Sequence, residues 1–330
     1  MESEVKVSVL CAAYNHANYI RKTLDGFISQ KTDFAFEVWV HDDASTDDTA
    51  QIIREYEQKW PQIIKPIYQT ENQYQQKVSV FKEHLCPKAR GKYIAICEGD
   101  DYWTDDTKLQ QQFDYMEAHP DCSMVAHKTV KVFEDGSLLG NFSNRNFSDP
   151  SACYLSAEEV ITNVNDFHTS SLFFRKSAYE RNKAFFDTIP EYDYAVKILF
   201  ATDLPGDMYI IPEVMSAYRV SAVGSWSQRI RDDNTNYIRY IEQSISFLKD
   251  LDEYREHKYH HAIETEILNR EFKIEVLKHN KAAWKMEKYQ AVIQAMPGKQ
   301  RISSYLDLHM PKLFKGIYVL YQHIKRFVEK

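Results

Sequence analysis

The stretch Tyr93-Ile-Ala-Ile-Cys-Glu-Gly-Asp-Asp-Tyr-Trp103 joins a short apolar run to two adjacent carboxylates, Asp100 and Asp101. The apolar run predicts a strand that ends at the acidic cluster. A second acidic pair, Asp42 and Asp43, follows another β-rich run in the same manner. Because ligands bind at the carboxyl ends of the strands in an open parallel sheet, the two pairs predict a binding site at this edge.

From about residue 5 to residue 119, β-rich runs alternate with amphipathic helical stretches, a pattern typical of βαβ units. The expected strands are 5–13, 36–41, 63–68 and 93–97, and the expected helices are 18–30, 45–59 and 107–119. Ser45-Thr-Asp-Asp48 resembles a capping box that would open the second helix. In the middle of the chain, further strands are expected at 123–133, 169–175, 208–211 and 214–218, with helices at 157–162 and 191–202. The predicted fold class is therefore α/β, with a Rossmann-like, mostly parallel sheet that has a mixed edge.

Beyond about residue 227 the strand signals fade into polar, helical sequence that is broken at Met296-Pro-Gly298 and at Pro311. We therefore expect two parts, a ligand-binding domain over 1–227 and a helical region over 228–330. The last twenty residues mix large apolar side chains with Lys and Arg, as an interfacial amphipathic helix would. Either they contact an anionic membrane surface, or they pack on protein, including a second copy of the chain.

The composition of this 330-residue chain narrows the classes of protein further. The net charge of −7 argues against a nucleic-acid-binding protein. The five cysteines form no CxxC pair, which favours reduced thiols, and the acidic start does not resemble a signal peptide. We therefore expect a cytoplasmic protein, either free or peripheral on the cytoplasmic face of the membrane.

The two acidic pairs have a metal-binding and a structural interpretation. Carboxylate oxygens suit Mg²⁺ or Mn²⁺, which complete their coordination with phosphate oxygens and water. Adjacent carboxylates in a regular strand point to opposite faces, so they can converge only at a turn, and Gly99 supplies one. An isolated Asp-Asp pair, in contrast, often caps a helix or lies in a solvated loop.

Three segments, Val9–Asn15, His41–Asp48 and Ala89–Trp103, occur in an order and spacing that resemble family 2 glycosyltransferases of the GT-A fold. The resemblance is close over residues 5–120 and looser to about residue 226. It implies an inverting enzyme that moves a sugar from a nucleotide diphosphate donor, with a UDP-sugar expected from the family's habit. The implied acceptor is a hydroxyl of a glycan, glycoprotein or lipid-linked glycoconjugate, as in bacterial polysaccharide synthesis.

The resemblance also implies roles for the residues that match the family's motifs. The implied donor-binding residues are Ala13, Tyr14, Asn15, Asp42, Asp43 and Asp100. In the DxD-type motif, Asp101 would face a Mn²⁺ or Mg²⁺ ion and Asp100 the ribose, sugar or metal. Two departures stand out: Ala12-Ala13 lacks the hydroxyl that many relatives carry, and Gln73–Val80 replaces a Gly-rich, Arg-bearing stretch. Lys77 could substitute there as a phosphate-binding charge.

An inverting displacement needs a base that takes the proton of the acceptor hydroxyl, and a carboxylate is the usual choice. Residues 189–200 resemble the family segment in which a helix begins with this acid, which implies Asp193, with Glu191 as the alternative. Either acid could instead be a first-turn partner of the helix dipole. His168 is a candidate metal ligand or a structural histidine. Arg219 and Trp226 could bind the diphosphate or stack on a sugar, or serve packing only.

Two other classes of function remain open from the sequence. A catalytically inactive homologue could act as a binding or assembly module through its helical region. A sugar-phosphate nucleotidyltransferase would normally carry a Gly-rich, basic loop after the first strand, and Asn15-His-Ala-Asn18 is not such a loop.

Overall fold

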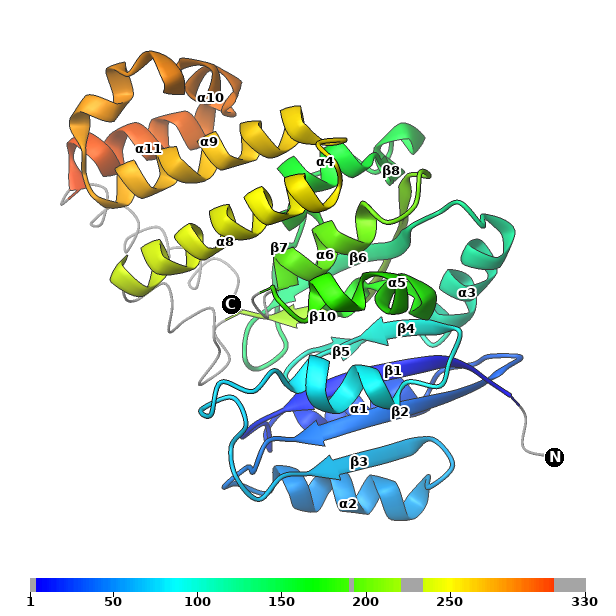
Figure 1. Ribbon diagram of the computed structural model, residues 1–330. Coiled ribbons are helices and arrows are strands. Elements are labelled where there is room, and N and C mark those ends of the chain that lie inside the picture. The colour runs from blue at the N-terminus through cyan, green and yellow to red at the C-terminus, as the bar shows by residue number, and fades with distance from the viewer. Residues whose placement is uncertain (1–3, 190–192, 221–233, 312–330) are drawn as a thin grey trace. The chain divides into compact units, whose positions relative to one another are not determined.

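The computed structural model describes residues 4–189, 193–220 and 234–311. The chain divides into two compact units, 1–222 and 223–330, and each is considered by itself. Figure 1 shows strands throughout the first unit and helices in the second.

The first unit is built on one mixed sheet with the strand order β3-β2-β1-β4-β9-β6-β10-β5. Its strands are β1 (Val5–Ala13), β2 (Ala35–Asp42), β3 (Ile64–Tyr68), β4 (Tyr93–Ile96), β5 (Tyr102–Trp103), β6 (Met124–Val132), β7 (Leu138–Asn141), β8 (Tyr154–Leu155), β9 (Phe173–Arg175) and β10 (Met208–Arg219). The first four strands are parallel to one another, and β9 is antiparallel to both β4 and β6. This arrangement confirms the α/β class and the mixed edge.

Six α-helices accompany the sheet in the described part of this unit, and α2 lies beside the edge strand β3 (Figure 1). They are α1 (Ile20–Ile28), α2 (Thr49–Lys59), α3 (Lys108–Ala118), α4 (Ala157–Thr162), α5 (Lys176–Phe186) and α6 (Asp193–Ala201). The predicted elements are confirmed to within a few residues, except that β9 is shorter and the two runs 208–211 and 214–218 form the single strand β10. The strands β5, β7 and β8 and the helix α5 were not expected.

The predicted capping box at the start of α2 is wrong. The helix begins at Thr49, and Asp48 makes no side-chain cap. The Ser45 hydroxyl instead accepts a hydrogen bond from the main-chain N–H of Asn15 at 2.9 Å, and Asp47 accepts one from the Thr49 N–H at 3.0 Å. The segment before α2 is therefore tied to the loop after β1 and does not form the first helical turn.

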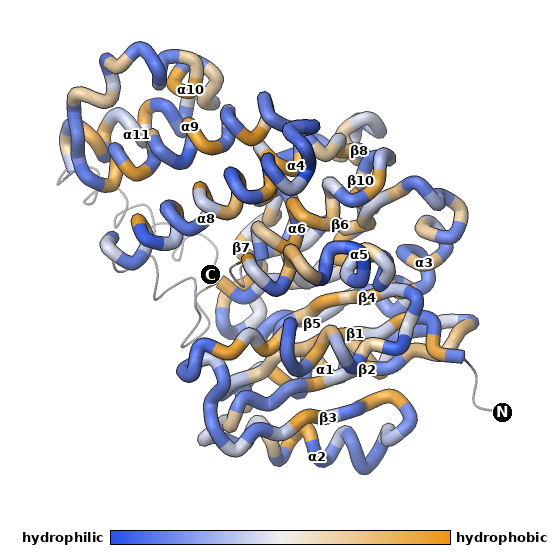
Figure 2. The backbone as a smooth tube through the Cα atoms, in the orientation of Figure 1, coloured by the Kyte–Doolittle hydropathy of each residue, from blue (hydrophilic) through white to orange (hydrophobic). Residues whose placement is uncertain are grey.

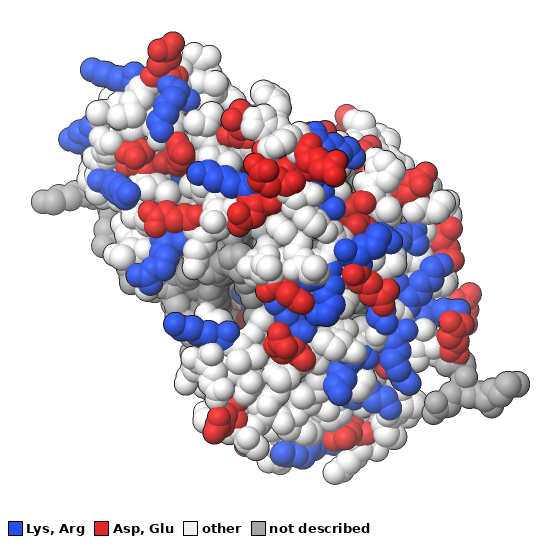
Figure 3. Space-filling view, viewed as in Figure 1, with Lys and Arg blue, Asp and Glu red and all other residues white. Residues whose placement is uncertain are grey.

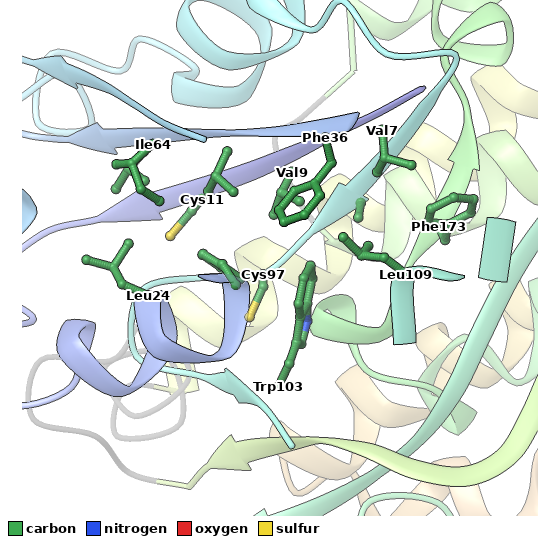
Figure 4. Close-up of a cluster of buried hydrophobic side chains, with 14 of the residues drawn as sticks. Val7, Val9, Cys11, Leu24, Phe36, Ile64, Cys97, Trp103, Leu109 and Phe173 are labelled. Atoms are coloured by element: carbon green, nitrogen blue, oxygen red, sulfur yellow. The ribbon is translucent and has the colours of Figure 1, made fainter. Parts of the chain in front are cut away.

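The main core lies between β1 to β4 and the helices α1 to α3. In Figure 4, Val9 and Cys11 of β1 lie near Leu24, Cys97 and Trp103. Strands β1 and β4 are largely hydrophobic along their length (Figure 2), as expected for strands covered on both faces. This rigid sheet holds the loops that follow β1, β2 and β4, and these loops carry the predicted site.

A buried carboxylate fixes the start of β4 against β1 and β2. Glu37 of β2 accepts hydrogen bonds from the Ser8 hydroxyl at 2.7 Å and from the main-chain N–H of Arg90 at 3.0 Å. The Arg90 guanidinium also pairs with Glu37 at 2.7 Å. Burial raises the pKa of Glu37, but these hydrogen bonds outweigh it, so the pKa lies below its ordinary value.

We expect Glu37→Ala to lower the free energy of unfolding by about 3 kcal/mol, because the change removes several hydrogen bonds from a buried position. Urea denaturation at neutral pH measures this loss. The difference from wild type should shrink as the pH falls through the lowered pKa of Glu37, where the native carboxylate becomes protonated. The control is Glu55→Ala, which removes an exposed ion pair with Arg21 and should cost less than about 1 kcal/mol. Equal losses of unfolding free energy in the two variants would contradict the stabilising role of the buried Glu37 carboxylate.

The second unit is helical in its described part, as predicted. It contains α8 (Asn234–Tyr254), α9 (His260–Leu277), α10 (Gln290–Ala295) and α11 (Gly298–His309), and α8 contacts α9. The break between α10 and α11 falls at the predicted Met296-Pro-Gly298. None of the described helices has both the length and the apolar character needed to cross a bilayer. Residues 312–330, most of the expected interfacial segment, lie outside the described residues.

Candidate active site

The acidic segment after β4 is held against β1 by main-chain contacts. The Cys97 N–H donates to the Leu10 carbonyl at 3.1 Å, and the Gly99 N–H donates to the Ala12 carbonyl at 2.9 Å. A Cβ atom at Gly99 would lie 2.8 Å from His16 Nδ1 and 3.0 Å from the Ala13 Cβ, so this close approach favours glycine. The segment therefore leaves the sheet as a turn, in agreement with the role expected for Gly99.

This turn separates the two adjacent carboxylates. Asp101 is only 1% exposed, whereas Asp100 is half-buried. The Asp101 Oδ1 accepts a hydrogen bond from the main-chain N–H of Arg219 at 2.9 Å, and its Oδ2 lies 3.6 Å from His168 Nδ1. The Arg219 guanidinium donates to the Asp100 carbonyl. The end of β10 thus orients both acids.

Three side chains bring potential metal ligands together at Asp101. Glu98, Asp101 and His168 each offer one ligand atom, and these atoms lie within 4.8 Å of one another. Burial and repulsion by Asp100 raise the pKa of Glu98 to about 8, and burial with the same repulsion raises the pKa of Asp101. A divalent cation would relieve this concentration of negative charge, so the donor set fits Mn²⁺ or Mg²⁺, with the imidazole favouring Mn²⁺.

His168 is a neutral imidazole beside Asp101, and metal binding through Nδ1 would replace its hydrogen bond from Ser170. Burial and the nearby Lys197 lower its pKa to about 3, so the imidazole is uncharged at neutral pH. Its Nδ1 accepts a hydrogen bond from the Ser170 N–H at 3.2 Å, and its ring stacks on Tyr218 with centroids 4.3 Å apart. These contacts fix the ring next to Asp101.

Asp193 is the first residue of α6, and its carboxylate is held by three groups. Its Oδ2 lies 3.1 Å from Lys197 Nζ and 3.4 Å from the Thr169 hydroxyl, and its Oδ1 accepts from the Tyr194 N–H at 2.8 Å. Burial raises the pKa of Asp193, but the charge of Lys197 and these hydrogen bonds outweigh it, so the pKa is lowered. The side chain is 41% exposed, so the ionised carboxylate can be reached from solvent.

Asp101 and Asp193 belong to the same cluster of contacts. His168 approaches Asp101, and the next residue, Thr169, contacts Asp193. The charge of Asp193 also contributes to the raised pKa of Glu98. The residue expected to face the metal and the residue expected to act as a base are therefore neighbours, which an active site built from both requires.

The second acidic pair lies at the end of β2, and its two members differ in their contacts. Asp43 is fully engaged, since its Oδ1 accepts from the Gln73 N–H at 2.7 Å and its Oδ2 from the Tyr74 N–H at 3.1 Å. Asp42 is buried, and its Oδ2 accepts from the Ser45 N–H at 3.4 Å, while its Oδ1 has no hydrogen-bond partner. Burial raises the pKa of Asp42. Asp42 therefore keeps one buried oxygen without a hydrogen-bond partner, whereas Asp43 organises the loop around residue 73.

The loop after β1 lies next to this pair. The Ala13 carbonyl accepts from the Asp43 N–H at 2.9 Å, which links the ends of β1 and β2. Asn15 has a positive φ of 54°, and its side-chain oxygen accepts from the Thr46 N–H at 2.8 Å. Tyr14 is partly exposed between these two anchored residues.

Comparison with known proteins assigns the chain to a family. A family model described as glycosyl transferase family 2 matches residues 8–182, more than half of the chain. The chain belongs to glycosyltransferase family 2.

Two relatives illustrate the sequence identity and the coverage that this family 2 glycosyltransferase shares with other proteins. An uncharacterised Mycobacterium tuberculosis protein, Rv1520, is 35% identical over 233 residues, which are 68% of this chain and 62% of the relative. An Escherichia coli protein, named as the UDP-Glc:alpha-D-GlcNAc-diphosphoundecaprenol beta-1,3-glucosyltransferase WfaP, is 35% identical over 42% of this chain and 51% of its own length. The chain thus spans less than two thirds of the length of these relatives.

Solved structures confirm the GT-A fold of the family 2 glycosyltransferase. Residues 1–349 of Staphylococcus aureus TarS, in complex with UDP-GlcNAc, give a TM-score of 0.57 at 19% identity, covering 94% of this chain and 88% of that one. The mannosyltransferase PcManGT from Pyrobaculum calidifontis, in complex with GDP-Man and Mn²⁺, gives a TM-score of 0.53 at 18% identity. This match covers 99% of this chain and 87% of that one.

The remaining residues expected in the site of this glycosyltransferase differ in what the structure shows of them. Lys77 is exposed, has a positive φ of 61°, and forms no ion pair among the described residues. Arg219 is buried against the rings of Tyr19 and Tyr102, where it supports the acidic turn. Glu191 and Trp226 lie outside the described residues.

Sequence reasoning missed Glu98, Thr169 and Lys197 in this family 2 site. Glu98 could have been found, because it is an acid two positions before Asp100 in the same segment. Lys197 follows Asp193 by one helical turn, a spacing that brings side chains together on one helix face. Thr169 carries no comparable signal, since its contact with Asp193 depends on how the 169–171 turn packs.

Proposed function

We propose that this family 2 glycosyltransferase transfers a sugar from a nucleotide diphosphate donor to an acceptor hydroxyl, with inversion at the anomeric carbon. The observation that carries the proposal is the contact network joining Asp101, His168, Thr169 and Asp193. The network supports the proposal because the carboxylate proposed to bind the metal, Asp101, and the accessible carboxylate of Asp193 share it. A single in-line displacement requires both groups on one side of the molecule.

In this mechanism, Asp101 would hold Mn²⁺ or Mg²⁺ together with His168 and Glu98, while Asp100 faces the ribose or sugar. The ion, when bound, neutralises the charge that develops on the leaving diphosphate. Asp193 accepts the proton of the acceptor hydroxyl as its oxygen attacks the anomeric carbon. Lys197 holds the Asp193 carboxylate in place and keeps it ionised before the proton arrives.

The proposed donor is a UDP-sugar. Asp42, with one oxygen free of hydrogen bonds, is suited to accept from an N–H of the base, and Tyr14 lies on the loop beside it. The E. coli relative is named as an enzyme of UDP-Glc, and the TarS structure contains UDP-GlcNAc. Since PcManGT was crystallised with GDP-Man, a guanine nucleotide is the main alternative.

A panel of UDP- and GDP-sugars tests the donor proposal without knowledge of the acceptor. We expect slow hydrolysis of at least one UDP-sugar in the presence of Mn²⁺, little with GDP-sugars, and none after chelation by EDTA. Release of UDP or GDP is the measured quantity. Faster hydrolysis of GDP-sugars than of UDP-sugars would overturn the proposal that the donor carries uracil. No hydrolysis of any donor with either metal would favour an inactive homologue that acts as a binding module.

The proposed acceptor is a growing polysaccharide or a lipid-linked glycoconjugate. The name of the E. coli relative specifies a sugar on diphosphoundecaprenol, which supports a lipid-linked acceptor. The proposed location is the cytoplasm, with residues 311–330 either at the membrane surface or packed on protein. Homo-oligomer formation through the helical unit belongs to the same proposal.

A further inference from the structure

The second unit contains a cluster of potential metal ligands where α8 turns into α9. Asp252 lies near the end of α8, His257 lies in the connecting turn, and His260 begins α9. The Asp252 Oδ2 is 3.0 Å from His257 Nδ1 and 2.7 Å from His260 Nδ1. Each residue offers one ligand atom, and the three atoms lie within 4.8 Å of one another.

We propose that these three residues form a Zn²⁺ site, separate from the acidic cluster of the first unit. Zinc binds imidazole nitrogens and carboxylate oxygens at about 2.0–2.2 Å in a tetrahedral arrangement. Tetrahedral ligands at that distance are about 3.3 Å apart, so zinc binding would require the two exposed histidine rings to move back slightly from Asp252. Two imidazoles with one carboxylate favour Zn²⁺ over Mg²⁺, which prefers oxygen ligands.

The carboxylate of Asp252 supplies independent support. Asp252 is 8% exposed, and its second oxygen, Oδ1, is buried without a hydrogen-bond partner. A buried carboxylate oxygen without a partner is unfavourable, and coordination of a cation by both oxygens of Asp252 would satisfy it. Hydrogen bonds between Asp252 and the two histidines satisfy only Oδ2.

The outer surroundings of the histidines resemble those of known zinc ligands. His257 Nε2 lies 3.7 Å from Glu253, and His260 Nε2 lies 3.4 Å from Glu264. Metal-bound histidines usually direct their second nitrogen toward a carboxylate or carbonyl, which fixes the ring. Acidic side chains gather over α8 and α9 in Figure 3, so the local field also favours a cation.

The backbone of the turn adapts to bring His257 back toward α8. Glu256 and His257 have positive φ values of 52° and 58°, which are unfavourable for residues other than glycine. Both histidine side chains remain about half exposed, at 56% and 52%. The fourth coordination position would therefore be open to water, and bound zinc would join α8 to α9.

Titration of the metal-free, tag-free full chain with Zn²⁺ tests the proposal, with calorimetry as the readout. We expect the wild-type protein to bind one more equivalent of Zn²⁺ than the double variant His257→Gln/His260→Gln. The matched control is His261→Gln, which alters an exposed neighbour on α9 and should keep this equivalent. Glu264→Gln, a surface change that leaves the three ligands intact, should weaken zinc binding by about tenfold. Circular dichroism confirms that each variant is folded.

The same titration with Asp101→Asn separates this site from the active site. Zinc binding that persists in Asp101→Asn and disappears in the double histidine variant supports the proposal. Equal stoichiometry and affinity in wild type and the double variant would overturn it, as would loss of all zinc binding in Asp101→Asn alone. If the double variant does not fold, unchanged affinity in Glu264→Gln together with full retention in Asp252→Asn would overturn it as well.

Discussion

Replacement of Asp193 by Asn is expected to lower the transfer rate by about two to four orders of magnitude while UDP affinity is retained. The amide has the same shape as the carboxylate, and its single oxygen can still accept one of the two hydrogen bonds, from Lys197 or from the Tyr194 N–H. It cannot accept the proton of the acceptor hydroxyl. Release of UDP in the presence of acceptor gives the rate, and calorimetry with UDP gives the affinity.

Two further variants make this test specific. Asp187→Asn changes an exposed acid that pairs with Lys183, and we expect it to keep the wild-type rate. Lys197→Met removes the cation that lowers the pKa of Asp193, so the acid limb of the pH–rate profile should move to higher pH. Wild-type turnover in Asp193→Asn would assign the base to another residue, and Glu191 would be the first to test.

Asp101→Asn is expected to abolish the increase in UDP affinity that Mn²⁺ produces. The change removes the negative charge of the most buried acid in the cluster, and about two orders of magnitude in affinity correspond to the several kcal/mol that metal coordination supplies. The fold should persist, because the Asn oxygen can still accept the hydrogen bond from the Arg219 N–H. Calorimetry with UDP, with and without Mn²⁺, measures the effect.

The control for this prediction is Asp106→Asn, which changes an exposed acid a few residues further along the chain. It should leave the metal-dependent affinity unchanged. Unaltered UDP affinity of Asp101→Asn in the presence of Mn²⁺ would refute the metal role of Asp101, although it would leave the role of Asp193 open. The two predictions can therefore fail separately.

The parallel half of the sheet could be predicted from the sequence because its strands are short apolar runs that end at polar turns. β1 matches its predicted range, and β4 ends one residue early. The two-residue strands β5 and β8 could not be predicted, because they owe their pairing to β10, a strand distant in the sequence. The start of α2 could not be predicted for the same reason. The Ser45 hydroxyl, which a capping box would need, accepts a hydrogen bond from the distant Asn15 N–H.

The candidate site could be predicted only in part, for a related reason. Adjacent acids at strand ends are visible in the sequence, and the resemblance to a family pointed to Asp193. The partners that set their chemistry are distant: Arg219 reaches Asp101 across 118 positions, and Thr169 reaches Asp193 across 24. The apparent equivalence of Asp42 and Asp43 was also misleading, since only the folded chain shows that loop N–H groups saturate Asp43.

The hydrogen bond that orients Asp101 comes from the main chain of Arg219 and not from its side chain. Every amino acid except proline supplies this N–H, so this one hydrogen bond to the carboxylate does not require an arginine at position 219, although the guanidinium supports the turn through the Asp100 carbonyl. In the proposed mechanism, a substitution at position 219 by any residue other than proline would therefore keep one hydrogen-bond donor on the carboxylate that holds the metal ion.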